Sequence, residues 1–157
     1  MKKFILPVLV ALLFSACTTE EYITEEYYTK VKTYSETYTV HWDMKYKYYW
    51  SEHFDDTGLY YYCTIEDRNL TDEIFRYGQM NAYLFYVPEG ETMGVLSPLP
   101  FSDFITGTDN NGNFIKWEEQ ITVEFAPGLI TFILKLDDHE PLPPFYKYYE
   151  FEVRFMW

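Results

Sequence analysis

The sequence is poor in cysteine and in basic residues. Its 157 residues include two cysteines, Cys17 and Cys63, which are too few for the disulfide framework of a small secreted scaffold. Lysine and arginine number 12 against 25 acidic residues, which gives a net charge of −13. A surface of that sign repels nucleic acid and anionic lipid, so the composition argues against nucleic acid as a partner.

The sequence also lacks the motifs of common enzymes. Fingerprints of serine hydrolases, zinc proteases, phosphate-binding loops and dinucleotide sites are absent. The three histidines, His41, His53 and His139, have no metal-ligand spacing. Glu118 and Glu119 are adjacent, so on a strand they would face opposite ways and could not form the facing pair of a glycosidase. We therefore expect no catalytic residue, no metal and no cofactor, and a hydrolase with an unrecognised site is the least favoured function.

No apolar run at the N-terminus is long enough to cross a bilayer. The run Phe4–Phe14 has 11 residues, and as a helix at about 1.5 Å per residue it falls well short of a hydrocarbon core of about 30 Å. Lys2 and Lys3 precede the run, and Ser15 and Ala16 follow it. A basic start, a short apolar region and small residues are typical of a secretory signal peptide.

The segment "FSAC" that ends at Cys17 resembles the lipobox of bacterial lipoproteins, with Phe14 where leucine is usual. The resemblance implies that residues 1–16 are removed and that Cys17 carries the lipid. Several acyl chains, at about 0.8 kcal/mol per buried CH₂, would anchor the protein in a membrane. Cys63 then has no intramolecular partner, and we interpret it as a small buried hydrophobic residue in a strand.

Two further resemblances concern the protein's location. The acidic pair Glu20–Glu21 resembles the surface-export signal of Bacteroidota lipoproteins. The run "W…YYYC…LT..I..YG", between Trp50 and Gly78, is similar to that of small Bacteroidota outer-membrane lipoproteins, a likeness that implies no activity. We expect a lipid-anchored protein of the outer membrane that faces the periplasm or the cell surface. The lipid anchor would attach the protein to that membrane.

After a lipidated tether at residues 17–32, residues 33–157 are predicted to form one β domain. Aromatic residues make up 22% of the chain, and they favour strands. Apolar and polar residues alternate with period two in Thr33–Trp42 and again in Tyr149–Trp157. The same alternation in Met44–Trp50 predicts a strand with Met44, Tyr46, Tyr48 and Trp50 inward, followed by a loop over Glu52–Gly58.

The remaining signals complete an antiparallel fold. A short helix is predicted before Gly78 with Thr71 as its N-cap. Asn111–Gly112 and Pro127–Gly128 predict hairpin turns, and Leu129–Leu136 is predicted to be a central strand. The expected fold is all-β, an antiparallel β-sandwich of about 8–9 strands with one short connecting helix. A closed barrel is the alternative.

The surplus of tyrosine is the one functional signal. Tyr49, Tyr60 and Tyr62 alternate with the residues expected to face the core, so we expect them on the outer side of their strands. Tyrosines on a sheet face can stack on sugar rings or anchor a protein partner, although such residues can also be covered by a second layer. The sequence favours a non-catalytic binding module for a glycan or a protein. The alternative is a structural or accessory subunit of an outer-membrane assembly.

Overall fold

The computed structural model describes residues 31–56, 58–88, 91–108, 113–136 and 148–157. The predicted signal peptide, Cys17 and most of the predicted tether lie outside these residues, and so does the Asn111–Gly112 turn. Within the described ranges, no helix has the length and apolar character needed to span a bilayer.

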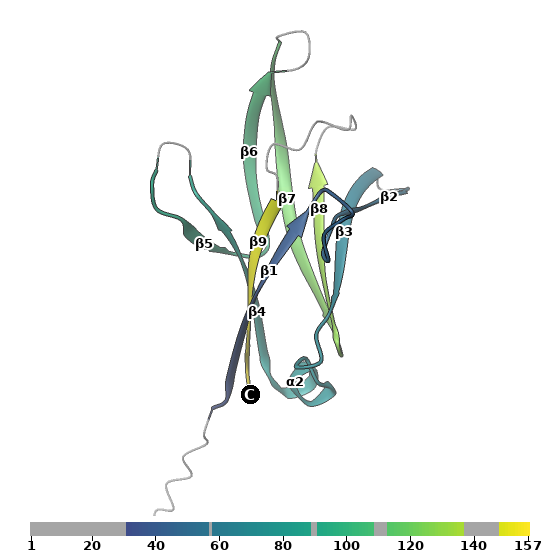
Figure 1. The fold of residues 1–157 in the computed structure, drawn as a ribbon, viewed down its shortest axis with the longest axis vertical. Helices are drawn as coiled ribbons and strands as arrows, with labels where there is room; N and C mark the ends of the chain where they lie inside the picture. The colour runs from purple at the N-terminus through teal and green to yellow at the C-terminus, as the bar shows by residue number, and fades with distance from the viewer. Residues whose placement is uncertain (1–30, 57, 89–90, 109–112, 137–147) are drawn as a thin grey trace, which may run out of the picture. The chain divides into compact units, whose positions relative to one another are not determined.

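The described residues contain nine strands and one helix (Figure 1). In chain order they are β1 (Thr33–His41), β2 (Ser51–Asp55), β3 (Gly58–Glu66), α2 (Asp72–Tyr77), β4 (Gln79–Tyr86), β5 (Val95–Pro98), β6 (Phe101–Thr108), β7 (Phe114–Ala126), β8 (Leu129–Leu136) and β9 (Tyr148–Met156). One sheet has the order β1-β9-β4-β5 and the other β2-β3-β8-β7-β6, and all paired strands are antiparallel. The predicted β-sandwich with one short helix is confirmed, since the strands form two sheets and not one closed barrel.

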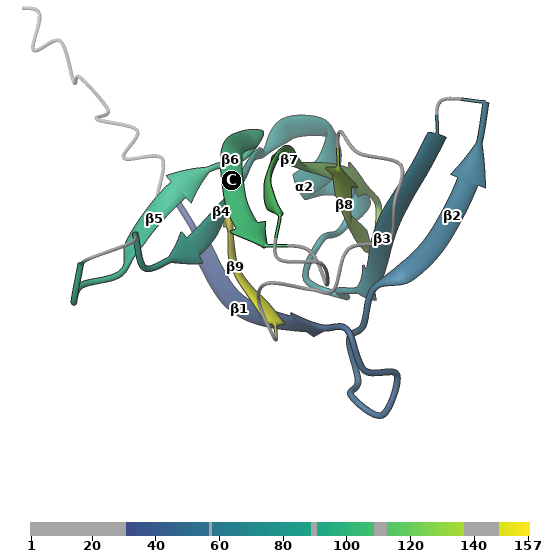
Figure 2. The same cartoon turned by 90° about the horizontal axis from the view of Figure 1, so that it is seen from above.

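Aromatic rings fill the space between the two sheets, whose layers are seen in end view in Figure 2. Phe132 of β8 stacks on Phe151 of β9 with ring centroids 4.0 Å apart, and both side chains are fully buried. Phe125 of β7 meets Phe155 of β9 at 6.3 Å. These contacts join the sheets through large apolar surfaces, each of which stabilises the fold by a few kcal/mol.

The period-two predictions for the last strands are confirmed. In β9, Tyr149, Phe151, Val153 and Phe155 are buried, and Trp157 beyond the strand is partly buried. The strand β8 lies in the middle of its sheet, as the apolar residues on both of its faces predicted.

The turns and the helix also follow their predictions. β7 and β8 form a hairpin in which Gly128 has a φ of +76°, a conformation that glycine adopts without strain. β6 and β7 are paired antiparallel, as the predicted second hairpin requires, while the Asn111–Gly112 turn itself lies outside the described residues. In α2 the Ile74 amide donates to Thr71 Oγ1 at 3.3 Å, and the Gly78 amide donates to the Ile74 carbonyl at 2.8 Å.

The prediction for residues 44–58 is wrong in two respects. Met44 is 76% exposed in a turn, because the Asp43 side chain accepts from the Lys45 amide at 3.0 Å and bends the chain before a strand can form. The expected loop over Glu52–Gly58 contains most of β2, which pairs with β3. An edge strand is held by backbone hydrogen bonds on one side, so its polar sequence is tolerated.

Candidate functional site

The outer surface of the five-stranded sheet carries a cluster of three rings, here called the aromatic face: His53, Tyr60 and Tyr62. Antiparallel pairing sets His53 of β2 opposite Tyr60 of β3. Ring centroids are 4.9 Å apart for His53 and Tyr60, and 6.4 Å for Tyr60 and Tyr62. Tyr61 and Cys63 point into the core, so the period of the strand leaves the alternate tyrosines outside.

Mostly polar side chains surround the aromatic face. The register sets Thr64 beside Thr131 of β8, with their hydroxyl oxygens 3.1 Å apart. On β8, Ile133 lies beside Tyr62 and Lys135 beside Tyr60. On β7, Thr122 and Gln120 follow them one strand further on. The Lys135 ammonium lies 5.8 Å from the centre of the Tyr60 ring. The face therefore combines ring surfaces with hydroxyl and amide groups, one ammonium and the apolar Ile133.

The structure brings together two of the three tyrosines predicted as site residues. Tyr49 is 36% exposed and forms a backbone bridge with His41, and among the described residues no ring contact joins it to Tyr60 or Tyr62. His53 is an addition that the sequence did not predict, because β2 was expected to be a loop. The polar residues Ser51, His53 and Asp55 occupy alternate positions, and this spacing could have indicated a strand with His53 on its outer side.

A second group of polar side chains lies inside the sandwich, here called the Tyr149 cluster: Trp42, Trp50, Glu119 and Tyr149. The Tyr149 ring is 6.4 Å from Trp42 and 5.6 Å from Trp50, centroid to centroid. Its hydroxyl donates to the Glu119 carboxylate. Glu119, Trp50 and Tyr149 are buried, with Glu119 only 3% exposed, and Trp42 is partly buried.

Burial raises the pKa of Glu119 to about 7. This value is the net result of three effects: burial, which is the largest, the hydrogen bond from Tyr149, which lowers the pKa, and the negative charge of Asp103 on β6, which raises it. Glu118 lies on the opposite, outer side of β7; the sequence predicted that the two carboxylates face opposite ways but not which of them is buried. Glu118 accepts from Ser102 at 2.5 Å and from Gln120 at 3.2 Å, and these bonds hold its pKa below the usual value.

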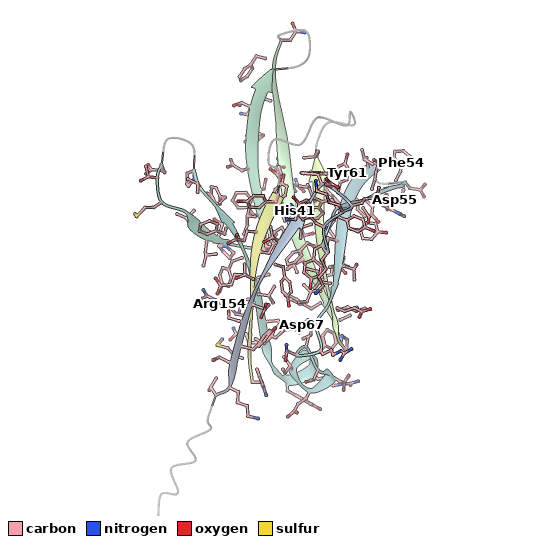
Figure 3. The ribbon with its side chains drawn as sticks, viewed as in Figure 1. His41, Phe54, Asp55, Tyr61, Asp67 and Arg154 are labelled. Carbon is pink, nitrogen blue, oxygen red and sulfur yellow. The ribbon has the colours of Figure 1, made fainter. Side chains whose placement is uncertain are left out.

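A buried carboxylate near α2, that of Asp67, has its hydrogen-bond partners within the protein. Figure 3 shows His41 and Tyr61 toward one end of the strands and Asp67 beside α2. The buried Asp67 accepts from the Tyr38 hydroxyl at 2.8 Å and from the backbone and side chain of Asn69 at 2.8 and 3.0 Å. These bonds satisfy the Asp67 carboxylate and give it a structural role.

The remaining candidates for chemistry are weak. Burial raises the pKa of the Cys63 thiol to about 11, so it stays protonated at neutral pH and is a poor nucleophile. In the described part of the chain, no three His, Cys, Asp or Glu residues are grouped so as to hold a metal ion. A hollow of about 420 Å³ lies beside Phe85 and Glu150, but the second carboxylate lining it, Glu152, already bonds Arg154 at 2.7 Å.

The fold thus defines an all-β protein of the antiparallel sandwich class. No protein-family model, no curated protein and no solved structure matches this chain.

Proposed function

We propose that this protein is a lipid-anchored, non-catalytic binding module that holds a glycan on its aromatic face. The observation that carries the proposal is the grouping of His53, Tyr60 and Tyr62 on one sheet surface, with ring centroids 4.9 to 6.4 Å apart. Aromatic rings offer flat apolar surfaces on which a sugar ring can stack, and the tyrosine hydroxyls add hydrogen bonds.

The surroundings of the rings favour a glycan over a protein ligand. The centre of a protein interface is usually a dry, closely packed apolar patch. Here Thr64, Thr131, Thr122 and Gln120 lie on the same face as the rings, and each has a group that bonds sugar hydroxyls. Lys135 beside Tyr60 and Glu124 beside Thr131 can bond sugar hydroxyls as well. This mixture of ring surface and polar groups is suited to a hydroxyl-rich ligand.

The lipid anchor on Cys17 would hold the module at the outer membrane, facing the periplasm or the cell surface. A 15-residue tether at residues 18–32, at about 3.3 Å per extended residue, would reach about 50 Å. Metabolic labelling with palmitate tests the anchor. The Cys17→Ala variant should lose the label, and an unchanged label would refute the anchor.

Glycan binding is tested with the full-length protein, purified in detergent, on a glycan array. The Tyr60→Ala/Tyr62→Ala double variant should lose at least about tenfold in affinity, which corresponds to about 1.4 kcal/mol. Tyr83→Ala is the matched control, because Tyr83 lies on the other sheet, where it contacts Arg154 at 4.8 Å. Its binding should be unchanged.

Three results would contradict the proposal. Binding that survives in the double variant would place the glycan elsewhere. A blank array together with a membrane protein that co-purifies would favour the accessory-subunit alternative. Turnover of a bound glycan would show that the module is catalytic.

A further inference from the structure

The Tyr149 cluster contains an unusual concentration of unpaired polar atoms. In the residues that the structure describes, three buried side-chain atoms have no hydrogen-bond partner: Trp42 Nε1, Trp50 Nε1 and Glu119 Oε1. All three belong to side chains that contact Tyr149. Buried polar atoms are paired in the great majority of cases, so three unpaired ones around one ring indicate a place for a ligand.

The hydrogen-bonding capacity of these atoms defines what would satisfy them. Each indole N–H of Trp42 and Trp50 can only donate. Above its pKa of about 7, Glu119 is ionised and can only accept, so the fit to a ligand and its test apply to that pH range. A hydroxyl group has two acceptor lone pairs and one donor hydrogen, which is the complement of this set. The negative carboxylate disfavours an anion, and the two N–H donors disfavour a cation.

The surroundings suit the carbon part of such a ligand. Tyr61 packs against Trp42 edge to face at 4.9 Å, and Trp42 and Trp50 are 6.1 Å apart, so aromatic carbon borders the polar atoms. Trp42 is only partly buried, whereas Trp50, Glu119 and Tyr149 are buried. Apolar walls with a few convergent polar groups are typical of small-molecule sites.

We propose that the Tyr149 cluster is a second binding site, specific for a small neutral alcohol or polyol. One hydroxyl group of this ligand accepts from the indole N–H groups of Trp42 and Trp50 and donates to Glu119. The site faces the interior of the sandwich and shares no residue with the aromatic face, so it does not depend on glycan binding there.

The test is NMR of the full-length ¹⁵N-labelled protein, with the indole signals assigned through Trp42→Phe and Trp50→Phe. Ethanol, glycerol and xylitol are the probes. At least one of them should shift the Trp42 and Trp50 indole signals in a saturable way with a common midpoint. The indole signal of Trp157, which lies beside Lys32, should not move.

Substitutions test whether the probe occupies the Tyr149 cluster. Glu119→Leu removes the acceptor and should weaken the probe at least tenfold, whereas the surface control Glu118→Gln should bind as the wild type does. If Glu119→Leu does not fold, Trp50→Phe, which removes one donor, serves the same purpose. The Tyr60→Ala/Tyr62→Ala variant should keep the shifts even if it loses all glycan binding.

Three outcomes would overturn the inference. The first is that none of the three probes shifts both indole signals. The second is that Glu119→Leu binds the probe with unchanged affinity. The third is that cross-relaxation between water and both indole hydrogens persists at saturating probe, which would show that an ordered water alone satisfies these atoms.

Discussion

Replacing Glu119 by glutamine should stabilise the fold at neutral and alkaline pH. The wild-type carboxyl is 3% exposed, and burial raises its pKa from the ordinary 4.5 to about 7. Between these two pH values the folded state keeps a proton that the unfolded state has released. Wild-type stability therefore falls as the pH rises through this window and is level above it.

The size of the effect follows from the two pKa values. A pKa unit corresponds to about 1.4 kcal/mol, so the difference between 4.5 and about 7 amounts to about 3 kcal/mol. Glutamine keeps the shape of the side chain and an oxygen that can accept from Tyr149, but it carries no charge. The Glu119→Gln variant should match the wild type near pH 4 and exceed it by up to about 3 kcal/mol at pH 8.

Urea unfolding followed by tryptophan fluorescence, repeated from pH 4 to pH 8, measures this difference. Glu118→Gln is the matched control at the neighbouring position. Hydrogen bonds from Ser102 and Gln120 lower the pKa of Glu118, so its charged form is favoured in the fold and its replacement should not stabilise the protein at pH 8. Equal pH profiles for the wild type and Glu119→Gln would refute the reasoning that burial governs this carboxyl.

Three further substitutions test the packing, a buried hydrogen bond and a turn. Phe132→Ala removes a fully buried ring stacked on Phe151 and should cost about 3–5 kcal/mol in urea unfolding, so a cost below about 1 kcal/mol would contradict the observed packing. Tyr38→Phe removes the donor 2.8 Å from Asp67 and should cost about 1–3 kcal/mol in the same assay, whereas an unchanged midpoint would mean that this bond contributes nothing. Gly128→Ala places a side chain at a φ of +76° with no atom within 4 Å, so backbone strain alone should lower stability by about 1–2 kcal/mol in thermal unfolding; no change would mean that the turn relaxes.

Local patterns predicted most of the elements. The buried face of β9 followed from its alternation, because side chains on a strand point to opposite sides whatever the partner strand is. The β7–β8 hairpin followed from Pro127–Gly128, because a turn is set by the conformation of its own residues. The predicted strand over Met44–Trp50 is absent, since the local hydrogen bond from the Lys45 amide to Asp43 outweighed the alternation. Of its predicted inward residues, Met44 and Tyr46 are exposed, while Tyr48 is partly buried and Trp50 is buried.

The candidate sites depended on contacts that local patterns do not contain. Tyr60 and Tyr62 were predicted to share a face, but the pairing of β2 with β3 added His53 and did not add Tyr49. The opposite orientation of Glu118 and Glu119 was predicted, but the sequence did not say which of the two would be buried. The sheet order places Glu119 on the inner face of β7.

The sequence by itself determined most of the strand-forming segments, the β7–β8 turn, the short helix and the parity of strands such as β8 and β9, because these depend on neighbouring residues. It did not determine β2 or the turn over residues 43–46. The sequence also carries the lipobox-like segment at Cys17, which no tertiary contact is needed to recognise. Only the tertiary structure decided the strand order, the grouping of rings on the aromatic face and the burial of Glu119 beside Tyr149. Those features join residues far apart in the chain, and their energies arise from packing and desolvation, which exist only once the two sheets have come together.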